Sequence, residues 1–300
     1  MDLEFFADPA AFLDAAGDLL AAEPVLGTVI GSVTERTKRE LAAGIDSWAE
    51  VGAPFDRWWL VVRDEAGKPV STAMRTAPFH PNPVFALPMA DEEAAALAVA
   101  LHERGESLGG VNGALPTVSL IAAETARLVG GDVTVHQHTR LWEATDVTVP
   151  PAPPGRLRRA TEADAPLVLE WFTAFHVEAD VQAGREPDPT GGEHNTMDSA
   201  LVRIREGVEW LWESPAGEVV HLTGRSVPAY GVSRIGPVFT PREHRGAGLA
   251  SHVVGELTRT GLEAGDRMCL FTDQANPTSN KIYEALGYRP VVEMANLLIG

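Results

Sequence analysis

The most informative stretch of the sequence is VFTPREHRGAGLA, residues 238–250. It joins an apolar run to a segment with helical periodicity, so we predict a strand, a turn and a helix. Gly246 and Gly248 allow positive φ in the turn and let backbone N–H groups approach a ligand closely. Those groups lie at a helix N-terminus, which favours anions, and Arg245 adds a positive charge. The stretch therefore predicts a pyrophosphate-binding turn, with a plain strand-to-helix turn as the alternative.

Two other phosphate-binding loops fit this stretch poorly. A P-loop has Lys followed by Ser or Thr after its last glycine, whereas Leu249 and Ala250 follow Gly248 here. A dinucleotide-binding fingerprint has Gly or Ala where this chain has Ser251, and an acidic residue at the end of a second strand. Glu263 lies at about the right distance but inside the expected helix, so it does not fit that role.

The segments on either side of this turn add two further observations. Residues 235–238, Ile-Gly-Pro-Val, place Gly and Pro inside an apolar strand, which indicates a bulge or a break in the ladder because Pro cannot donate. A broken ladder leaves backbone groups free for an extended ligand with amides, such as the pantetheine arm of CoA. Residues 273–280 form a polar turn suited to cap a final helix that carries Tyr283.

Two motifs in these segments resemble those of the GNAT superfamily of N-acetyltransferases. Arg245-x-x-Gly248-x-Ala250 is similar to the family's pyrophosphate motif. Asn276-Pro277-x-Ser279-Asn280-x-x-Tyr283-x-x-x-Gly287-Tyr288 resembles its second motif, and the two occur in the family's order and spacing. The resemblance covers roughly residues 156–300. It implies a mixed sheet splayed between two strands, with acetyl-CoA in the gap and direct acetyl transfer to an amine.

The resemblance also implies roles for individual residues. The backbones of Val238, Phe239 and Thr240 would bind the pantetheine amides. Asn276 would contact the cofactor arm from the other side, and Tyr283 would protonate the leaving CoA thiolate as the general acid. The pyrophosphate cradle would consist of Arg245, Gly246, Ala247, Gly248, Leu249, Ala250 and Ser251.

The proline-rich residues 149–155 divide the chain into halves with a similar order of expected elements. We therefore expect an α/β fold (an α+β mixed sheet) of two tandem GNAT-like domains, each a mostly antiparallel sheet flanked by helices. Residues 1–148 would be a degenerate domain without a cofactor site, residues 149–155 a linker, and residues 156–300 the catalytic domain. In the first half the stretch corresponding to the cradle lacks Arg and Gly, and Asp91, Glu92 and Glu93 would repel phosphate.

The acceptor side of the predicted site is less well defined by the sequence. Glu209 and Glu213 alternate along an expected strand, and one of them, with Glu213 preferred, is a candidate general base. The alternative is that both lie on the solvated face of that strand. His221 is a similar candidate, and the group His176, Glu178 and Asp180 could bind or deprotonate an amine or lie in a solvated loop.

Other reactive residues have plainer interpretations. His136 and His138 could bind a metal, but without a nearby partner a solvated strand face is favoured, and we expect no metal. Cys269 could be a nucleophile, but its apolar neighbours favour a buried structural residue. Trp58 and Trp59 are expected in a core or a domain interface.

The formal net charge of −18 over 300 residues disfavours binding to nucleic acid or to anionic membranes. It favours a cationic amine, carried by a small molecule or a peptide, as the acceptor. No secretory signal or membrane span is visible, so we expect a cytoplasmic protein, either a monomer or a homodimer. The alternative function is a non-catalytic acyl-CoA-binding regulator, whereas a GNAT-type toxin acting on charged tRNA would require a basic face.

Overall fold

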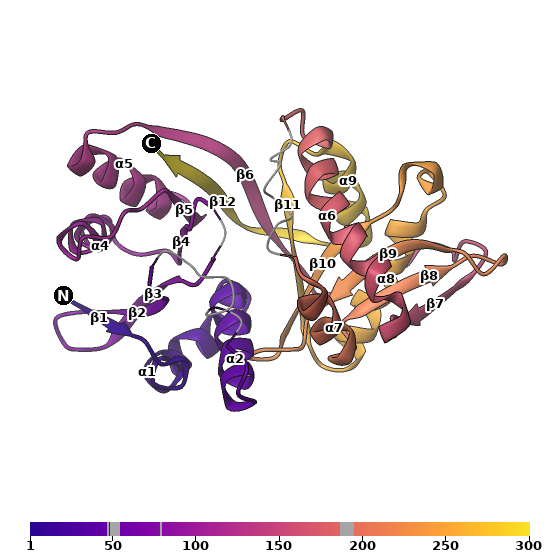
Figure 1. The fold of residues 1–300 in the computed structure, drawn as a ribbon, viewed down its shortest axis with the longest axis horizontal. Coiled ribbons are helices and arrows are strands. Elements are labelled where there is room, and N and C mark those ends of the chain that lie inside the picture. The colour runs from indigo at the N-terminus through magenta and orange to yellow at the C-terminus, as the bar shows by residue number, and fades with distance from the viewer. Residues whose placement is uncertain (47, 49–54, 79, 187–194) are drawn as a thin grey trace. The chain divides into compact units, whose positions relative to one another are not determined.

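The computed structural model describes residues 1–46, 48, 55–78, 80–186 and 195–300, and these form two compact units (Figure 1). The first unit contains Met1–Arg140 and Val292–Gly300, and the second contains Leu141–Val291. The boundary between the units therefore falls before the proline-rich residues 149–155, and the C-terminal residues belong to the first unit.

Among the described residues, the first unit begins with a strand that the sequence patterns did not predict. Two helices and three strands follow, and then two pairs of a helix and a strand. Its sheet has the strand order β1-β2-β3-β4-β5-β12-β6. Its elements in chain order are β1 (Asp2–Phe6), α1 (Pro9–Ala22), α2 (Thr28–Ala42), β2 (Trp58–Arg63), β3 (Pro69–Arg75), β4 (Val84–Ala86), α4 (Asp91–Glu103), β5 (Gly110–Ala114), α5 (Thr117–Val129) and β6 (Val133–Ala144).

The second unit repeats this order, which confirms the predicted duplication of an α/β unit. Its sheet has the order β6-β11-β10-β9-β8-β7. Its elements are β7 (Arg156–Arg159), the short helix η1 (Glu162–Asp164), α6 (Ala165–Gln182), α7 (Met197–Arg205), β8 (Glu209–Glu213), β9 (Val219–Arg225), β10 (Val232–Phe239), the short helix η2 (Arg242–His244), α8 (Leu249–Glu263), β11 (Arg267–Asp273), α9 (Pro277–Leu286) and β12 (Arg289–Ile299).

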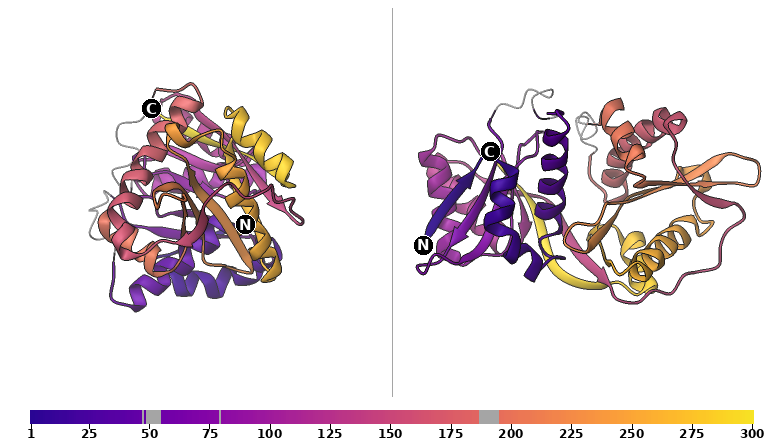
Figure 2. Two further views of the ribbon diagram at one scale, coloured as in Figure 1. Left: turned by 90° about the vertical axis from the view of Figure 1, so that its right-hand side faces the viewer. Right: turned by 90° about the horizontal axis from the view of Figure 1, so that it is seen from below.

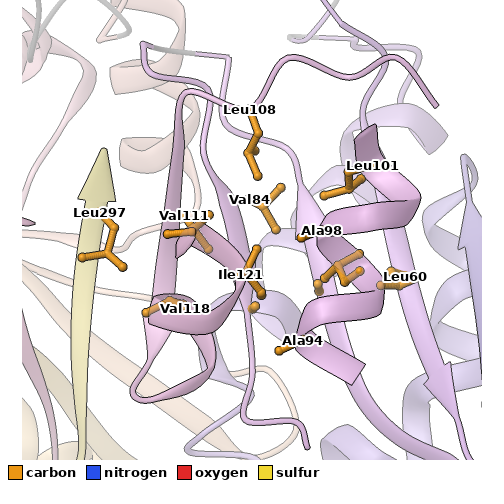
Figure 3. Close-up of a cluster of buried hydrophobic side chains, with 14 of the residues drawn as sticks. Leu60, Val84, Ala94, Ala98, Leu101, Leu108, Val111, Val118, Ile121 and Leu297 are labelled. Carbon is orange, nitrogen blue, oxygen red and sulfur yellow. The ribbon is translucent and has the colours of Figure 1, made fainter. Parts of the chain in front are cut away.

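Each sheet is covered by helices on both faces. In the first unit, Leu60 of β2 packs with Leu101 of α4 and Ile121 of α5 in one cluster (Figure 3). The next residue back, Trp59, points to the other face, where it stacks on Phe12 of α1 at 6.3 Å between ring centroids. This alternation along β2 follows from the two-residue period of a strand, and it confirms a core role for the tryptophan pair.

In the second unit, α6 and α7 lie on one face of the sheet and α8 and α9 on the other (Figure 2, right). Leu211 and Phe239 join the cluster under α6, whereas Ile235 joins the cluster under α8. Burial of apolar surface on both faces stabilises β10, the strand that carries the predicted cofactor site.

The terminal strands are exchanged between the units. Residues 294–298 of β12 pair antiparallel with β5 in the first unit. Leu141–Ala144 of β6 belong to the second unit, where Trp142 donates a 2.8 Å hydrogen bond from Nε1 to Thr272 Oγ1 of β11. Each sheet is therefore completed by residues from the other half of the sequence.

The proline-rich residues 149–155, which the sequence predicts as a linker, pack against helix and strand residues of the second unit. The Pro154 carbonyl accepts from Trp212 Nε1 at 3.2 Å, and the Pro150 carbonyl lies 2.8 Å from His252 Nδ1 of α8. Gly255 of α8 leaves room for Val149, whose Cα would be 3.4 Å from an added Cβ. The stiff, proline-rich backbone of residues 149–155 therefore lies against helix α8.

Other differences from the sequence prediction concern element ends. The sequence pattern predicts a helix over residues 34–51. The structure has α2 there, which begins at Thr28 and ends at Ala42; residues 47 and 49–51 lie outside the described part. The strands β1, β4, β5 and β12 were not predicted. β4 has three residues and β5 contains two glycines, so neither shows a clear period-two pattern.

Candidate active site

The predicted gap in the sheet of the second unit is present between β10 and β11. The two strands pair in parallel only from Val232 opposite Arg267 to Ile235 opposite Leu270. Both continue past this point, to Phe239 and to Asp273, with no further pairing between them. The edge of β10 that faces β11 thus offers unpaired backbone groups over its last four residues, a slot suited to an amide-bearing chain.

Gly236 and Pro237 produce the break, as predicted. The pairing of β10 with β9 shifts register between Ile235 and Val238, and Gly236 has φ of 145°. Gly224 of β9 faces this bulge, and an added Cβ there would be 2.5 Å from the Gly236 carbonyl oxygen. The absence of a side chain at Gly224 therefore permits the bulge to approach its neighbour.

The glycine-rich turn has the geometry that an anion cradle requires. Gly246 and Gly248 have φ of 79° and 78°, so both are in the left-handed region that glycine favours. The sequence predicts a helix that begins at Gly246, but Gly248 has left-handed backbone geometry and α8 begins only at Leu249. No side chain caps α8, so its first-turn N–H groups have no partner from the helix itself and remain available to a pyrophosphate.

A buried histidine supports the start of this turn. The two ring nitrogens of His221 lie 2.8 Å from Thr240 Oγ1 and 2.7 Å from Thr223 Oγ1. Burial lowers the pKa of His221 to about 3, so the ring is neutral and one nitrogen donates while the other accepts. Arg245 in turn donates from Nε to the Thr240 carbonyl oxygen at 2.8 Å. His221 is therefore a poor base but a firm support for Thr240.

Tyr283 lies in the cluster under α8, against which Val238 also packs. Its side chain is 8% exposed, and within the described residues its hydroxyl has no hydrogen-bond partner. Burial raises the pKa of Tyr283 to about 12, so the phenol keeps its proton at neutral pH. A phenol that keeps its proton at neutral pH, in the cluster against which Val238 of β10 packs, has the properties of a general acid.

Asn276 serves first as the cap of α9. Its Oδ1 accepts from the Ser279 N–H at 3.1 Å, as the polar turn predicted, and its Nδ2 donates to Gln182 Oε1 at 3.0 Å. A contact between this side chain and a cofactor arm would therefore have to compete with Gln182 of α6.

The two glutamates of β8 differ in environment. Glu213 binds Arg156 and Arg158 at 2.8 and 2.9 Å, and these hydrogen bonds lower the pKa of Glu213, which makes it a weak base. Glu209, expected on a solvated face, is instead fully buried and paired with Arg203 of α7 through Oε1. Its Oε2 has no hydrogen-bond partner, and burial raises the pKa of Glu209.

The group His176, Glu178 and Asp180 lies on helix α6, not in a solvated loop. Glu178 binds Arg245 of the turn and lies 3.5 Å from Arg242, while Asp180 binds Arg185 at 2.9 Å. The sequence contained both partners of the Glu178–Arg245 pair, but they are 67 positions apart.

The remaining candidates have structural roles. His136 and His138 are exposed on β6, as the solvated interpretation predicted, and Cys269 is fully buried in β11. In the part of the chain that the structure describes, no group of three His, Cys, Asp or Glu side chains could hold a metal ion. Across the same residues, every helix is too short or too polar to cross a membrane.

The corresponding strands of the first unit are closed where those of the second are splayed. β4 pairs in parallel with β5 along its whole length, up to Ala86 opposite Gly113. The backbones are so close that an added Cβ at Gly113 would meet the Ala86 carbonyl. The following helix, α4, begins with Asp91, Glu92 and Glu93. The splayed edge found between β10 and β11 therefore has no counterpart between β4 and β5.

Comparisons with known proteins agree with this architecture. A family model described as FR47-like protein matches residues 215–296, which contain both motifs. A Drosophila protein of known structure is similar over 99% of this chain and 98% of its own, with TM-score 0.67 and 14% identity. A GNAT-family acetyltransferase from Colwellia psychrerythraea has TM-score 0.55 and 12% identity, covering 100% of this chain and 99% of its own.

A third structure shares the tandem arrangement. It is a tandem GNAT protein from the clavulanic acid biosynthesis pathway, with TM-score 0.55 and 15% identity over 100% of this chain and 98% of its own. At these identities the likeness concerns the fold. It confirms the predicted resemblance to the GNAT superfamily at that level: this chain has the GNAT fold, as two units in tandem.

Proposed function

We propose that this protein is an acetyl-CoA-dependent N-acetyltransferase whose active site lies in the second unit. The observation that carries the proposal is the slot between β10 and β11, which ends at an uncapped helix preceded by two left-handed glycines. A ladder edge with free amides followed by an anion site matches, in order, the pantetheine arm and the pyrophosphate of CoA.

The chain's own groups suit each part of the cofactor. The backbone of Val238, Phe239 and Thr240 would bind the pantetheine amides along the open edge of β10. The turn from Arg245 to Ser251 would bind the pyrophosphate through N–H groups and one guanidinium. When bound, acetyl-CoA supplies an acetyl thioester, whose transfer to a neutral amine releases the CoA thiol.

Tyr283 supplies the proton that this release requires. Its buried phenol is protonated at neutral pH and lies in the side-chain cluster next to β10. Among the carboxylates of β8, Glu209 fits the role of base better than Glu213, because Glu209 has an unpartnered oxygen and a raised pKa while Glu213 is held by two arginines. Because Glu209 is fully buried, it would receive the amine proton through water.

The first unit acts in this proposal as a copy that has lost cofactor binding, because β4 and β5 are paired along the whole of β4. The acidic surface favours a cationic amine, either a small molecule or a peptide, as the acceptor. A regulator that binds acyl-CoA without turnover is the second candidate; it needs the slot but gives no role to the protonated Tyr283.

A thiol-release assay tests the proposal. The protein is incubated with acetyl-CoA and a panel of amines that spans polyamines, amino sugars, amino acids and peptides, and acetylated product is identified by mass spectrometry. We expect thiol release that depends on one class of amine. Tight acetyl-CoA binding with no amine-dependent release across the panel would favour the regulator, and absence of acetyl-CoA binding would contradict both candidates.

A further inference from the structure

The last part of α6 and the residues after it touch both loops that border the slot. We call residues 178–185 the α6 terminal segment. Glu178 binds Arg245 and lies 3.5 Å from Arg242, both in the loop after β10. Gln182 binds Asn276 at 3.0 Å, and Arg185 binds Asp273 at 2.6 Å, both in the loop after β11.

The Glu178 carboxylate is paired with Arg245, the residue whose positive charge would bind the pyrophosphate. Its side chain is 20% exposed and that of Arg245 is 34% exposed, so the pair is partly shielded from water. An incoming pyrophosphate would meet a guanidinium that is already paired and a carboxylate of its own sign. Both effects oppose binding unless Glu178 moves away.

We propose that Glu178 is an internal anion which occupies Arg245 until the pyrophosphate of CoA replaces it, so that cofactor binding releases the α6 terminal segment. The inference rests on the proposed function, because it assumes that CoA binds to the turn after β10. The Glu178 carboxylate and the pyrophosphate compete for the Arg245 guanidinium. The pyrophosphate binds more strongly because it carries more charge and also accepts hydrogen bonds from the first-turn N–H groups of α8.

The other contacts explain why the release involves a segment rather than one side chain. Arg185 binds Asp180 and Asp273 together, so it ties the segment both to itself and to the end of β11. Gln182 holds the side chain that caps α9. Loss of the Glu178 anchor therefore leaves a segment tied to only one side of the slot, and its amides become more exposed to exchange.

The test compares Glu178→Gln with wild type by calorimetric titration of CoA. Gln keeps the size of the side chain and removes its charge. Since partly exposed ion pairs are weak, we expect the Kd for CoA to fall by about threefold to tenfold. Glu170→Gln is the matched control: it makes the same charge change on an exposed position of the same helix, and we expect no change in Kd.

Two further measurements distinguish release from simple repulsion. In an Arg245→Gln background, Glu178→Gln should improve affinity less than it does in wild type, because the competition for the guanidinium is absent and only the repulsion between like charges remains. Amide hydrogen exchange in the α6 terminal segment should rise when CoA binds to the wild type, and should already be raised in Glu178→Gln without CoA.

The results separate this inference from the proposed function. If wild type binds CoA and Glu178→Gln binds it equally or more weakly, Glu178 does not compete for Arg245 and the inference is wrong. An equal gain in the Arg245→Gln background, or unchanged exchange in the segment, would also overturn it. If neither wild type nor Glu178→Gln binds CoA, the assignment of the cofactor site fails, and the inference fails with it.

Discussion

Replacement of Tyr283 by Phe isolates one hydroxyl whose loss should affect chemistry but not structure. The side chain is 8% exposed, and its ring packs edge-on against that of Tyr288, with 6.0 Å between the ring centroids. Within the described residues its hydroxyl makes no hydrogen bond. Phe keeps the ring, so packing is retained and no hydrogen-bond partner is left unsatisfied. We therefore expect the free energy of unfolding at pH 7 to change by less than about 1 kcal/mol.

The catalytic effect should be much larger. General acid catalysis contributes roughly 10²–10⁴-fold to rate, and Tyr283→Phe deletes the proton that the leaving thiolate would take. We expect kcat to fall by that factor while the Kd for acetyl-CoA stays near the wild-type value.

The raised pKa adds an independent signature at high pH. The Tyr283 pKa is about 12 in the folded protein against 10.0 for the ordinary side chain. The neutral phenol thus contributes stability that is complete below pH 10 and is lost as the pH rises from about 10 to about 12. This difference in pKa corresponds to about 3 kcal/mol of unfolding free energy. Tyr283→Phe should lack this loss, so its unfolding free energy should fall less steeply than that of wild type over this range.

The decisive assay is single-turnover acetyl transfer to a verified acceptor, with denaturant unfolding at pH 7 and at pH 11 alongside. Tyr288→Phe is the matched control. It removes a hydroxyl that lies 2.6 Å from Thr258 Oγ1, so it should cost about 1 kcal/mol in stability and leave the transfer rate within about twofold of wild type. A Tyr283→Phe rate within about twofold of wild type under single-turnover conditions would refute the assignment of Tyr283 as the acid.

Three further predictions concern the cradle, the first unit and the buried histidine. Gly248→Asp should abolish acetyl-CoA binding in calorimetry. Gly265→Asp is the control and should retain binding: Gly265 also has a positive φ (90° against 78° for Gly248) and open surroundings, but it lies beyond the other end of α8. Equal losses of affinity in the two variants would contradict the assignment of the cradle. Titration should give one CoA per chain, because β4 and β5 are closed, and a stoichiometry of two would show that the first unit binds as well. The folded-state pKa of His221, about 3 against the usual 6.5, contributes stability above pH 6.5 that is lost as the pH falls, by up to about 5 kcal/mol near pH 3. His221→Asn should show a shallower loss of unfolding free energy between pH 7 and pH 4, and an unchanged slope would exclude His221 as its source.

The parts of the site that the sequence predicted are those encoded locally. The glycines of the turn, the Gly-Pro break in β10 and the Asn276 cap each follow from residue types a few positions apart, and the structure has all three. Tyr283 was identified through a motif, and its burial and raised pKa support the proposal that it acts as the general acid.

The features that the sequence did not predict depend on contacts between distant positions. Glu178 meets Arg245 only because α6 packs on the same face as the end of β10. Glu209 was expected in water because it alternates with Trp210 along a strand, but α7 covers that face and supplies Arg203 as the partner. A period-two pattern shows that two faces differ, not which face a helix covers.

The exchanged strands also limit how this chain can be divided. A fragment of residues 156–300 would lack Leu141–Ala144, and with them the Trp142 hydrogen bond to β11, the strand that borders the slot. Its last residues would have no β5 to pair with. A cut before residue 156 would therefore remove pairing partners from the sheets of both units, so we expect a fragment of residues 156–300 to be less stable than the full chain.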